Sequence, residues 1–176
     1  WPKKKIKIEK SLRYQLNDKF DFGNKVFLPY KIFNLDKILN EFDKILSNNP
    51  YLAKNLIVRN HPLRLNSKSH NLLSKFLKLK IKYFSKKFKS RLNQKNSTSI
   101  FIGQTTSVIV ALEKNLNVFH ICDNPYFDMY NEKIWNNLKV IKISENSYQY
   151  VLLKKNSFLT FNKNSKNKLI KNYEKI

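Results

Sequence analysis

The chain has 176 residues, of which 41% are hydrophobic, and a formal net charge of +23 at pH 7. This length suits one domain with a hydrophobic core, or half of a two-domain protein. No apolar run approaches the ~20 residues of a membrane-spanning helix, and the Trp1-Pro2-Lys3-Lys4-Lys5 segment lacks the apolar core of a signal peptide, so we expect a cytoplasmic protein. The chain does not begin with methionine, and we therefore expect a piece of a longer protein or a processed product.

Basic residues dominate the middle of the chain. Between Asp43 and Glu113 there are 14 Lys or Arg residues and no acidic residue, and nine of the 14 fall between Lys75 and Lys95. Such a surface favours polyanions: nucleic acid, anionic lipid or phosphorylated sugars. The alternative is compositional, because lysine, asparagine and isoleucine are frequent throughout the chain and many of these lysines are then ordinary solvated positions.

The first half of the chain alternates strand and helix patterns. Residues 25–30 form a short apolar run that ends near proline, and residues 34–46 carry apolar side chains at helical spacing. Residues 55–60 predict a second strand, which is stopped by His61-Pro62. Residues 77–83 alternate apolar side chains with lysines, and this period of two predicts a third, half-exposed strand at the edge of a sheet.

The second half continues this alternation. We expect a short helix at residues 86–94, a strand at 99–103, a helix at 106–114, and strands at 117–122 and 139–143. Six strands alternating with helices predict an α/β fold with a Rossmann-like parallel sheet and helices on both faces. In the common strand order 3-2-1-4-5-6, the chain reverses direction between strands one and four, and ligands bind beyond the carboxyl ends of these strands.

Composition divides the chain into three regions. Residues 1–24 contain no clear element and are typical of an interdomain connection or the end of a missing N-terminal domain. Residues 25–161 hold the predicted Rossmann-like domain, and residues 162–176 form a basic tail or short helix. The single cysteine, Cys122, lies in an apolar run, which predicts a buried side chain rather than a nucleophile. With two glycines, the chain has neither a G-x-G-x-x-G motif nor a P-loop.

A candidate phosphate-binding turn connects the strand at 99–103 to the helix at 106–114. The turn consists of Gly103, Gln104, Thr105, Thr106 and Ser107. Unpaired backbone N–H groups at the start of a helix, together with three hydroxyls, favour a bound phosphate. The alternative is that one hydroxyl only caps the helix. The strand order above places Pro29, Tyr30 and Lys31 opposite the turn and His61 beside it, which favours a binding crevice.

His61 is the candidate acid at this crevice. It follows the second strand, and Pro62 behind it restricts the backbone. An imidazole at this place can donate a hydrogen bond to a phosphate or protonate a departing one. The simpler alternative is a histidine that only ends a strand.

Three segments together resemble the C-terminal, nucleotide-binding half of GT-B glycosyltransferases over residues 25–161: strand-His61-Pro62, the strand-turn-helix at residues 103–107, and the strand that ends at Cys122-Asp123. The pattern is similar to that of bacterial sialyltransferases and polysialyltransferases, with their HP and Ser/Thr motifs, and of related surface-carbohydrate transferases. The chain departs from many of these enzymes at Val110, where they carry an acidic residue, and at Asn115 and Asn117, where they carry a glycine and a proline. Asn115 can still adopt the left-handed conformation that ends a helix.

This resemblance implies the donor-binding domain of a transferase that is active only when joined to an N-terminal domain. It implies a CMP-, CDP- or UDP-linked sugar or polyol phosphate as donor, a surface polysaccharide or glycolipid as acceptor, and no cofactor or metal. It further implies peripheral contact with the anionic inner face of the plasma membrane. The residues it implies are His61 as the catalytic residue, Gly103, Gln104, Thr105, Thr106 and Ser107 at the donor phosphate, and Pro29, Tyr30, Lys31 and Asp123 along the donor crevice.

Two other functions stay open on the sequence. A non-enzymatic nucleic-acid-binding module would use the basic region between Lys75 and Lys95, and its affinity would fall steeply with salt. A nucleotide-sugar epimerase of the same two-domain shape would place its nucleotide in the same crevice. His70 and His120 lack partners at metal-ligand spacing, so we expect no zinc site.

Overall fold

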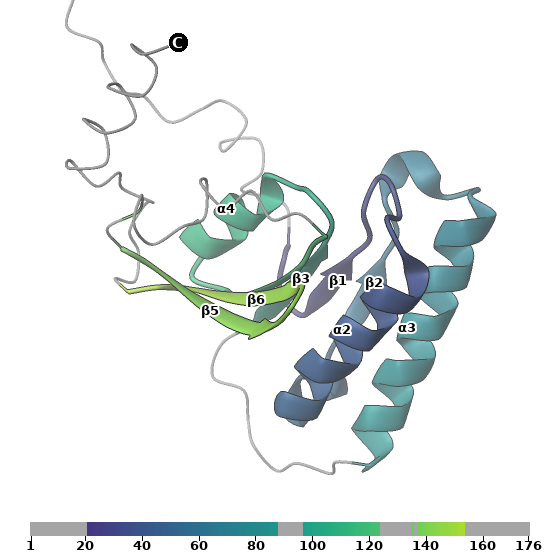
Figure 1. Cartoon of the computed structure of the whole chain (residues 1–176), viewed down its shortest axis with the longest axis horizontal. Helices are drawn as coiled ribbons and strands as arrows, with labels where there is room; N and C mark the ends of the chain where they lie inside the picture. The colour runs from purple at the N-terminus through teal and green to yellow at the C-terminus, as the bar shows by residue number, and fades with distance from the viewer. Residues whose placement is uncertain (1–20, 88–96, 124–134, 136, 154–176) are drawn as a thin grey trace, which may run out of the picture.

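The computed structural model describes residues 21–87, 97–123, 135 and 137–153. In this part of the chain, six strands form one mixed, mostly parallel sheet in the order β2-β1-β3-β4-β6-β5 (Figure 1). The strands are β1 (Lys25–Phe27), β2 (Ile57–Arg59), β3 (Thr98–Ile102), β4 (Asn117–Ile121), β5 (Leu138–Ser144) and β6 (Ser147–Leu152). The helices are α2 (Leu35–Asn48), α3 (Lys68–Lys87) and α4 (Ser107–Glu113), with short 3₁₀ turns η2 (Pro50–Lys54) and η3 (Pro62–Arg64).

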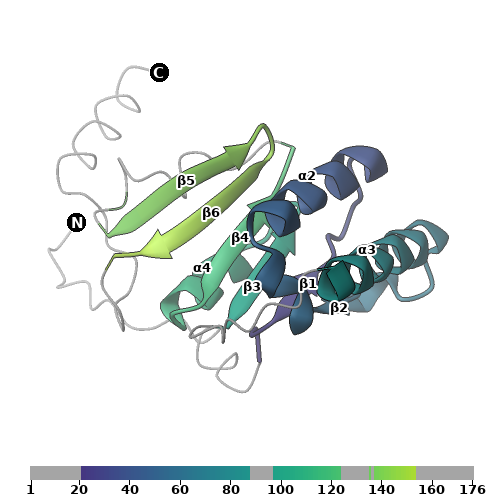
Figure 2. The ribbon, with the colours of Figure 1, turned by 90° about the horizontal axis from the view of Figure 1, so that it is seen from below.

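Helices cover both faces of the sheet, as predicted (Figure 2). Successive side chains of a strand point to opposite faces, so Ile100 and Ile102 of β3 pack with α2 and α3 in one core, whereas Phe101 packs with α4 in a second core. The first core is the larger, and Phe42 of α2 and Leu77 of α3 are fully buried in it. Each face of the sheet is therefore covered by a separate hydrophobic core.

Local sequence signals explain where α2 begins and where α4 ends. Asn34 caps α2, because its side chain accepts a hydrogen bond of 2.9 Å from the backbone N–H of Lys37. At the other end of the domain, α4 finishes with Asn115 at φ 60°, and the N–H groups of Asn115 and Leu116 donate to the carbonyls of Leu112 and Ala111. This is a Schellman cap, and it confirms the left-handed conformation predicted for Asn115.

The strand predicted at residues 77–83 is wrong, because this segment lies within α3. The period of two extends over only seven residues, whereas over the full 20-residue helix the buried side chains recur at helical spacing. These side chains are His70, Leu73, Ser74, Leu77, Ile81 and Phe84. Leucine and lysine favour helix, and Ile81 is the single β-branched residue of α3. The helix predicted at 86–94 lies largely outside the described residues.

A C-terminal hairpin makes the sheet mixed, so the prediction of a wholly parallel sheet is wrong. β5 and β6 pair antiparallel across the turn at Glu145-Asn146, and β6 lies between β4 and β5. A two-residue connection cannot contain a crossover helix, so these strands must run antiparallel. The predicted order 3-2-1-4-5-6 is therefore wrong at both edges: its third strand is part of α3, and at the other edge β6 lies between β4 and β5. The central prediction is confirmed, since β1 lies between β2 and β3 and all three run parallel.

The described chain begins with a packed segment. Phe22 is buried in the second core, and its carbonyl accepts a hydrogen bond of 2.6 Å from Ser99 Oγ. Residues 1–20 of the predicted connection and the predicted tail at 162–176 lie outside the described residues. Among the helices described, none has the length and apolar character needed to cross a bilayer.

Candidate functional site

A cavity of about 590 Å³, here called the crevice, opens where β1, β2 and β3 end. Each strand contributes the loop that follows it: Pro29 and Tyr30 after β1, Asn60, His61 and Pro62 after β2, and Gln104, Thr105 and Ser107 after β3. Parallel strands end at the same edge of a sheet, and the crevice lies at the point where the strand order reverses between β1 and β3. The structure thus brings together three loops that are distant in sequence.

The crevice has an aromatic floor with cationic side chains beside it. Phe27 of β1 and Phe101 of β3 stack with ring centroids 4.9 Å apart and an interplanar angle of 10°. The ammonium of Lys25 donates to the carboxylate of Asp21, and this hydrogen bond lowers the pKa of Asp21. This pair is neutral overall. The exposed side chain of Arg59 therefore gives the floor of the crevice a net positive charge. The crevice can accept both an apolar ring and an anion.

Tyr30 and His61 form one wall of the crevice. His61 Nδ1 accepts a hydrogen bond of 3.3 Å from the backbone N–H of Leu63, so the neutral ring carries its proton on Nε2 and can donate from there. The Tyr30 ring meets the His61 ring edge-on at 5.4 Å. Arg64 makes two contacts with Tyr30. Its guanidinium carbon lies 4.0 Å from the ring centroid, and its Nε donates a hydrogen bond of 3.2 Å to the Tyr30 carbonyl.

The turn after β3 forms the opposite wall. Gly103 has φ +74°, and a Cβ added to it would lie 2.8 Å from Pro29 Cβ, so the two walls touch at a place where only glycine fits. Thr105 Oγ1 accepts a hydrogen bond of 3.2 Å from the N–H of Ser107 at the start of α4. This bond supports the capping alternative for Thr105. Thr106 is exposed and does not line the crevice, whereas Ser107 does.

Two buried histidines hold the backbone of these walls. His70 Nε2 lies 2.9 Å from the Pro29 carbonyl, and His120 Nε2 lies 2.7 Å from the Gly103 carbonyl. A carbonyl oxygen only accepts, so both rings donate from Nε2. The Nδ1 atoms meet Ser67 Oγ at 2.9 Å and the Tyr150 hydroxyl at 3.1 Å. The sequence contains no signal for this role of the two histidines, because hydrogen bonds to distant carbonyls do not depend on the spacing of residues.

Burial keeps the groups beneath the turn neutral. Desolvation lowers the pKa of His120 to about 4, and burial together with the charge of Asp123 raises the pKa of Cys122 to about 12. Cys122 is fully buried, which confirms the prediction made for it. These side chains support the turn and are not available for acid-base chemistry at neutral pH.

Not every predicted site residue reaches the crevice. Lys31 is exposed and is not among the lining residues. The carboxylate of Asp123 accepts a hydrogen bond of 2.9 Å from Lys37 Nζ in α2, on the other side of the β4 end. Lys25 and Arg59 line the crevice and are not among the predicted site residues. Lys25 and Arg59 alternate with Val26 and Val58, which are buried on the opposite face, so the sequence places the two cationic residues on one side of the sheet. It does not indicate that a cavity opens on that side.

We expect His70→Leu to lower the free energy of unfolding by about 1–3 kcal/mol, because it leaves the buried carbonyl of Pro29 without its donor. Urea unfolding of the two proteins measures this loss. His70→Gln retains an N–H donor and should recover part of the stability. Equal losses for both variants would show that packing, rather than the hydrogen bond to the loop, is the contribution of His70.

Comparison of the chain with protein-family models, with curated proteins and with solved structures gave no match. The functional interpretation therefore depends on the geometry of the crevice. Within the described residues, no three His, Cys, Asp or Glu side chains lie close enough together to hold a metal ion.

Proposed function

We propose that this domain binds the phosphate and nucleotide part of an activated sugar or polyol phosphate, as the donor-binding half of a GT-B type glycosyltransferase. The observation that carries the proposal is the convergence of three loops on one crevice at the reversal point between β1 and β3. The parallel order β2-β1-β3-β4, with helices on both faces, is the arrangement in which such a crevice binds nucleotides. The acceptor would be a polysaccharide or glycolipid.

The chemistry of the lining supports a phosphorylated, ring-bearing ligand. Its volume of about 590 Å³ falls within the ~300–1,000 Å³ typical of small-molecule sites. The partly exposed ring of Phe27, which stacks on buried Phe101, offers an apolar surface for a base, and Arg59 and Ser107 offer donors to phosphate. His61 would donate from Nε2 to the phosphate and stabilise it as it departs.

A second domain is required for transfer in this proposal. Asp21 is the one acidic residue that lines the crevice in the described part of the chain, and its carboxylate is engaged with Lys25. A carboxylate held in this ion pair is a poor general base, because its low pKa opposes proton uptake. The group that activates the acceptor would therefore come from outside the described domain.

Calorimetric titration of the 176-residue chain with CMP, CDP and UDP tests the proposal. We expect at least one of these nucleotides to bind and His61→Ala to weaken binding by about tenfold or more, because a hydrogen bond to a charged group contributes about 1.5–3 kcal/mol. Asn66→Ala is the matched control, since Asn66 is exposed in the same loop and does not line the crevice. Equal affinities for the parent and the His61 variant would remove the main support for this site.

A further inference from the structure

The outward face of α3 carries a continuous apolar stripe. Leu72, Phe76, Leu79 and Tyr83 are spaced four, three and four residues apart, so they lie on one face of the helix, and each is between 38% and 57% exposed. The side chains that α3 buries lie on its opposite face. A solvated helix needs no such second stripe, and four large apolar side chains in a row indicate a surface that meets an apolar partner.

Lysines border this stripe. Lys75, Lys78, Lys82 and Lys86 follow one edge of it at helical spacing, and all four are exposed. On the other edge, Lys80 pairs with Asp43. The described part of α3 contains no acidic residue, so its outward face is both apolar and strongly cationic.

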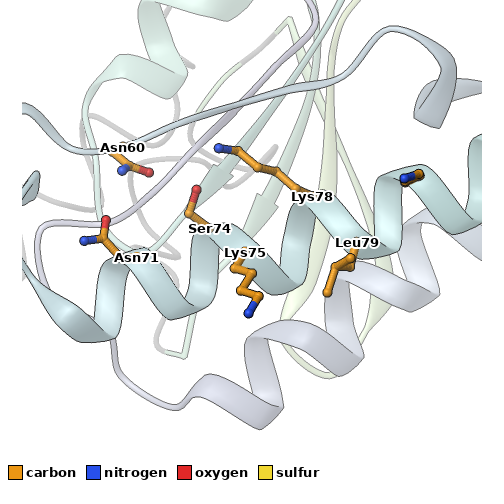
Figure 3. A pocket seen from close by; sticks show the side chains of 7 residues that line it. Asn60, Asn71, Ser74, Lys75, Lys78 and Leu79 are labelled. Carbon is orange, nitrogen blue, oxygen red and sulfur yellow. The ribbon is translucent and has the colours of Figure 1, made fainter.

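A groove runs along the lysine edge of α3. It has a volume of about 370 Å³ and is lined by three lysines, by neutral polar side chains and by Leu79 of the stripe. In Figure 3 the Lys78 ammonium reaches across Ser74 toward Asn60, which belongs to the loop after β2, and Asn71 borders the same space. An ammonium, a hydroxyl and two amides around one hollow can hydrogen-bond a phosphodiester.

We infer that α3 lies in the plane of an anionic membrane surface. The stripe enters the boundary between headgroups and acyl chains, the lysines contact lipid phosphates, and one headgroup phosphate occupies the groove. A second copy packed antiparallel on the stripe would place two lysine rows against each other, and nucleic acid would leave Leu72 and Leu79 without an apolar partner. An anionic lipid surface is the partner that complements both the charge and the stripe. Because Asn60 lines both the groove and the crevice, the membrane would lie beside the crevice.

Vesicle co-sedimentation of the 176-residue chain tests this inference. We expect binding at 0.15 M salt to vesicles of phosphatidylcholine with about 30% phosphatidylglycerol, and much weaker binding to phosphatidylcholine alone. Phe76→Ser with Leu79→Ser should weaken binding by about tenfold or more. Lys75→Glu, Lys78→Glu and Lys82→Glu together should weaken it by about a hundredfold or more, since each lysine near an anionic surface contributes about fivefold.

The matched control changes charge elsewhere on the surface. Lys54→Glu, Lys139→Glu and Lys142→Glu reverse three exposed lysines outside α3 and keep the same net charge as the α3 variant. An equal loss in this control would overturn the inference, because net charge alone would then explain binding. It would also be overturned if the parent fails to bind anionic vesicles, if the Phe76 and Leu79 variant binds them unchanged, or if that variant dissociates a dimer. Circular dichroism checks that each variant is folded.

Discussion

Gly103→Ala should lower the free energy of unfolding by about 2–5 kcal/mol and weaken nucleotide binding in the crevice. Two costs add: a residue with a Cβ at φ +74° loses about 1–2 kcal/mol, and a Cβ placed 2.8 Å from Pro29 Cβ overpacks the contact by a further 1–3 kcal/mol. Relief of the contact would move the Pro29 loop away from the turn, and both carry lining residues. Denaturant unfolding and nucleotide calorimetry on the same variant measure the two effects.

A double-mutant cycle separates the two costs. Pro29→Gly removes the Cβ that the new methyl group would meet, so in the double variant the overpacking cost should disappear and the backbone cost should persist. Thr106→Ala is the control in the same turn, because Thr106 is exposed and outside the crevice, and we expect its effect to stay within about 0.5 kcal/mol. Strict additivity of Gly103→Ala and Pro29→Gly would contradict the contact.

The sequence predicted the centre of the fold better than its edges. β1 to β4, α2 and α4 follow from apolar periods that are bounded by clear signals, such as the Asn34 cap and the Asn115 ending. The strand predicted within α3 is wrong because Lys78, Lys80 and Lys82 produce a period of two when only seven residues are considered. β6 is absent from the prediction, although Tyr148, Tyr150 and Leu152 alternate along it and pack into the second core.

For the candidate site, too, some features could be predicted from the sequence and others could not. Loops that follow parallel strands could be predicted to converge, so the positions of Tyr30, His61 and Ser107 agree with the expected crevice. Contacts across the fold could not be predicted, because they depend on distances between segments rather than on any local pattern. The ion pair of Asp123 with Lys37 and the hydrogen bonds of His70 and His120 belong to this second kind.

The buried ring of His120 should make the protein sensitive to mild acid. Its pKa is about 4 in the folded chain and 6.5 in the unfolded chain, so between these values the unfolded chain binds more protons. The free energy of unfolding therefore keeps its full value above pH 6.5. It decreases as the pH falls toward 4, because the unfolded chain gains a proton on His120 that the folded chain does not. With about 1.4 kcal/mol for each pKa unit, we expect a loss of roughly 2 kcal/mol between pH 7 and pH 5, measured by urea unfolding at each pH.

His120→Gln isolates this contribution. Glutamine keeps an N–H donor for the Gly103 carbonyl and cannot take up a proton in this range, so the variant should start less stable at pH 7 and lose about 2 kcal/mol less than the parent on acidification to pH 5. All other groups are the same in both proteins, so their contributions cancel in the difference. Parallel curves for parent and variant would show that another group senses the acid. Convergent curves would identify His120 as the group whose protonation destabilises the fold in mild acid.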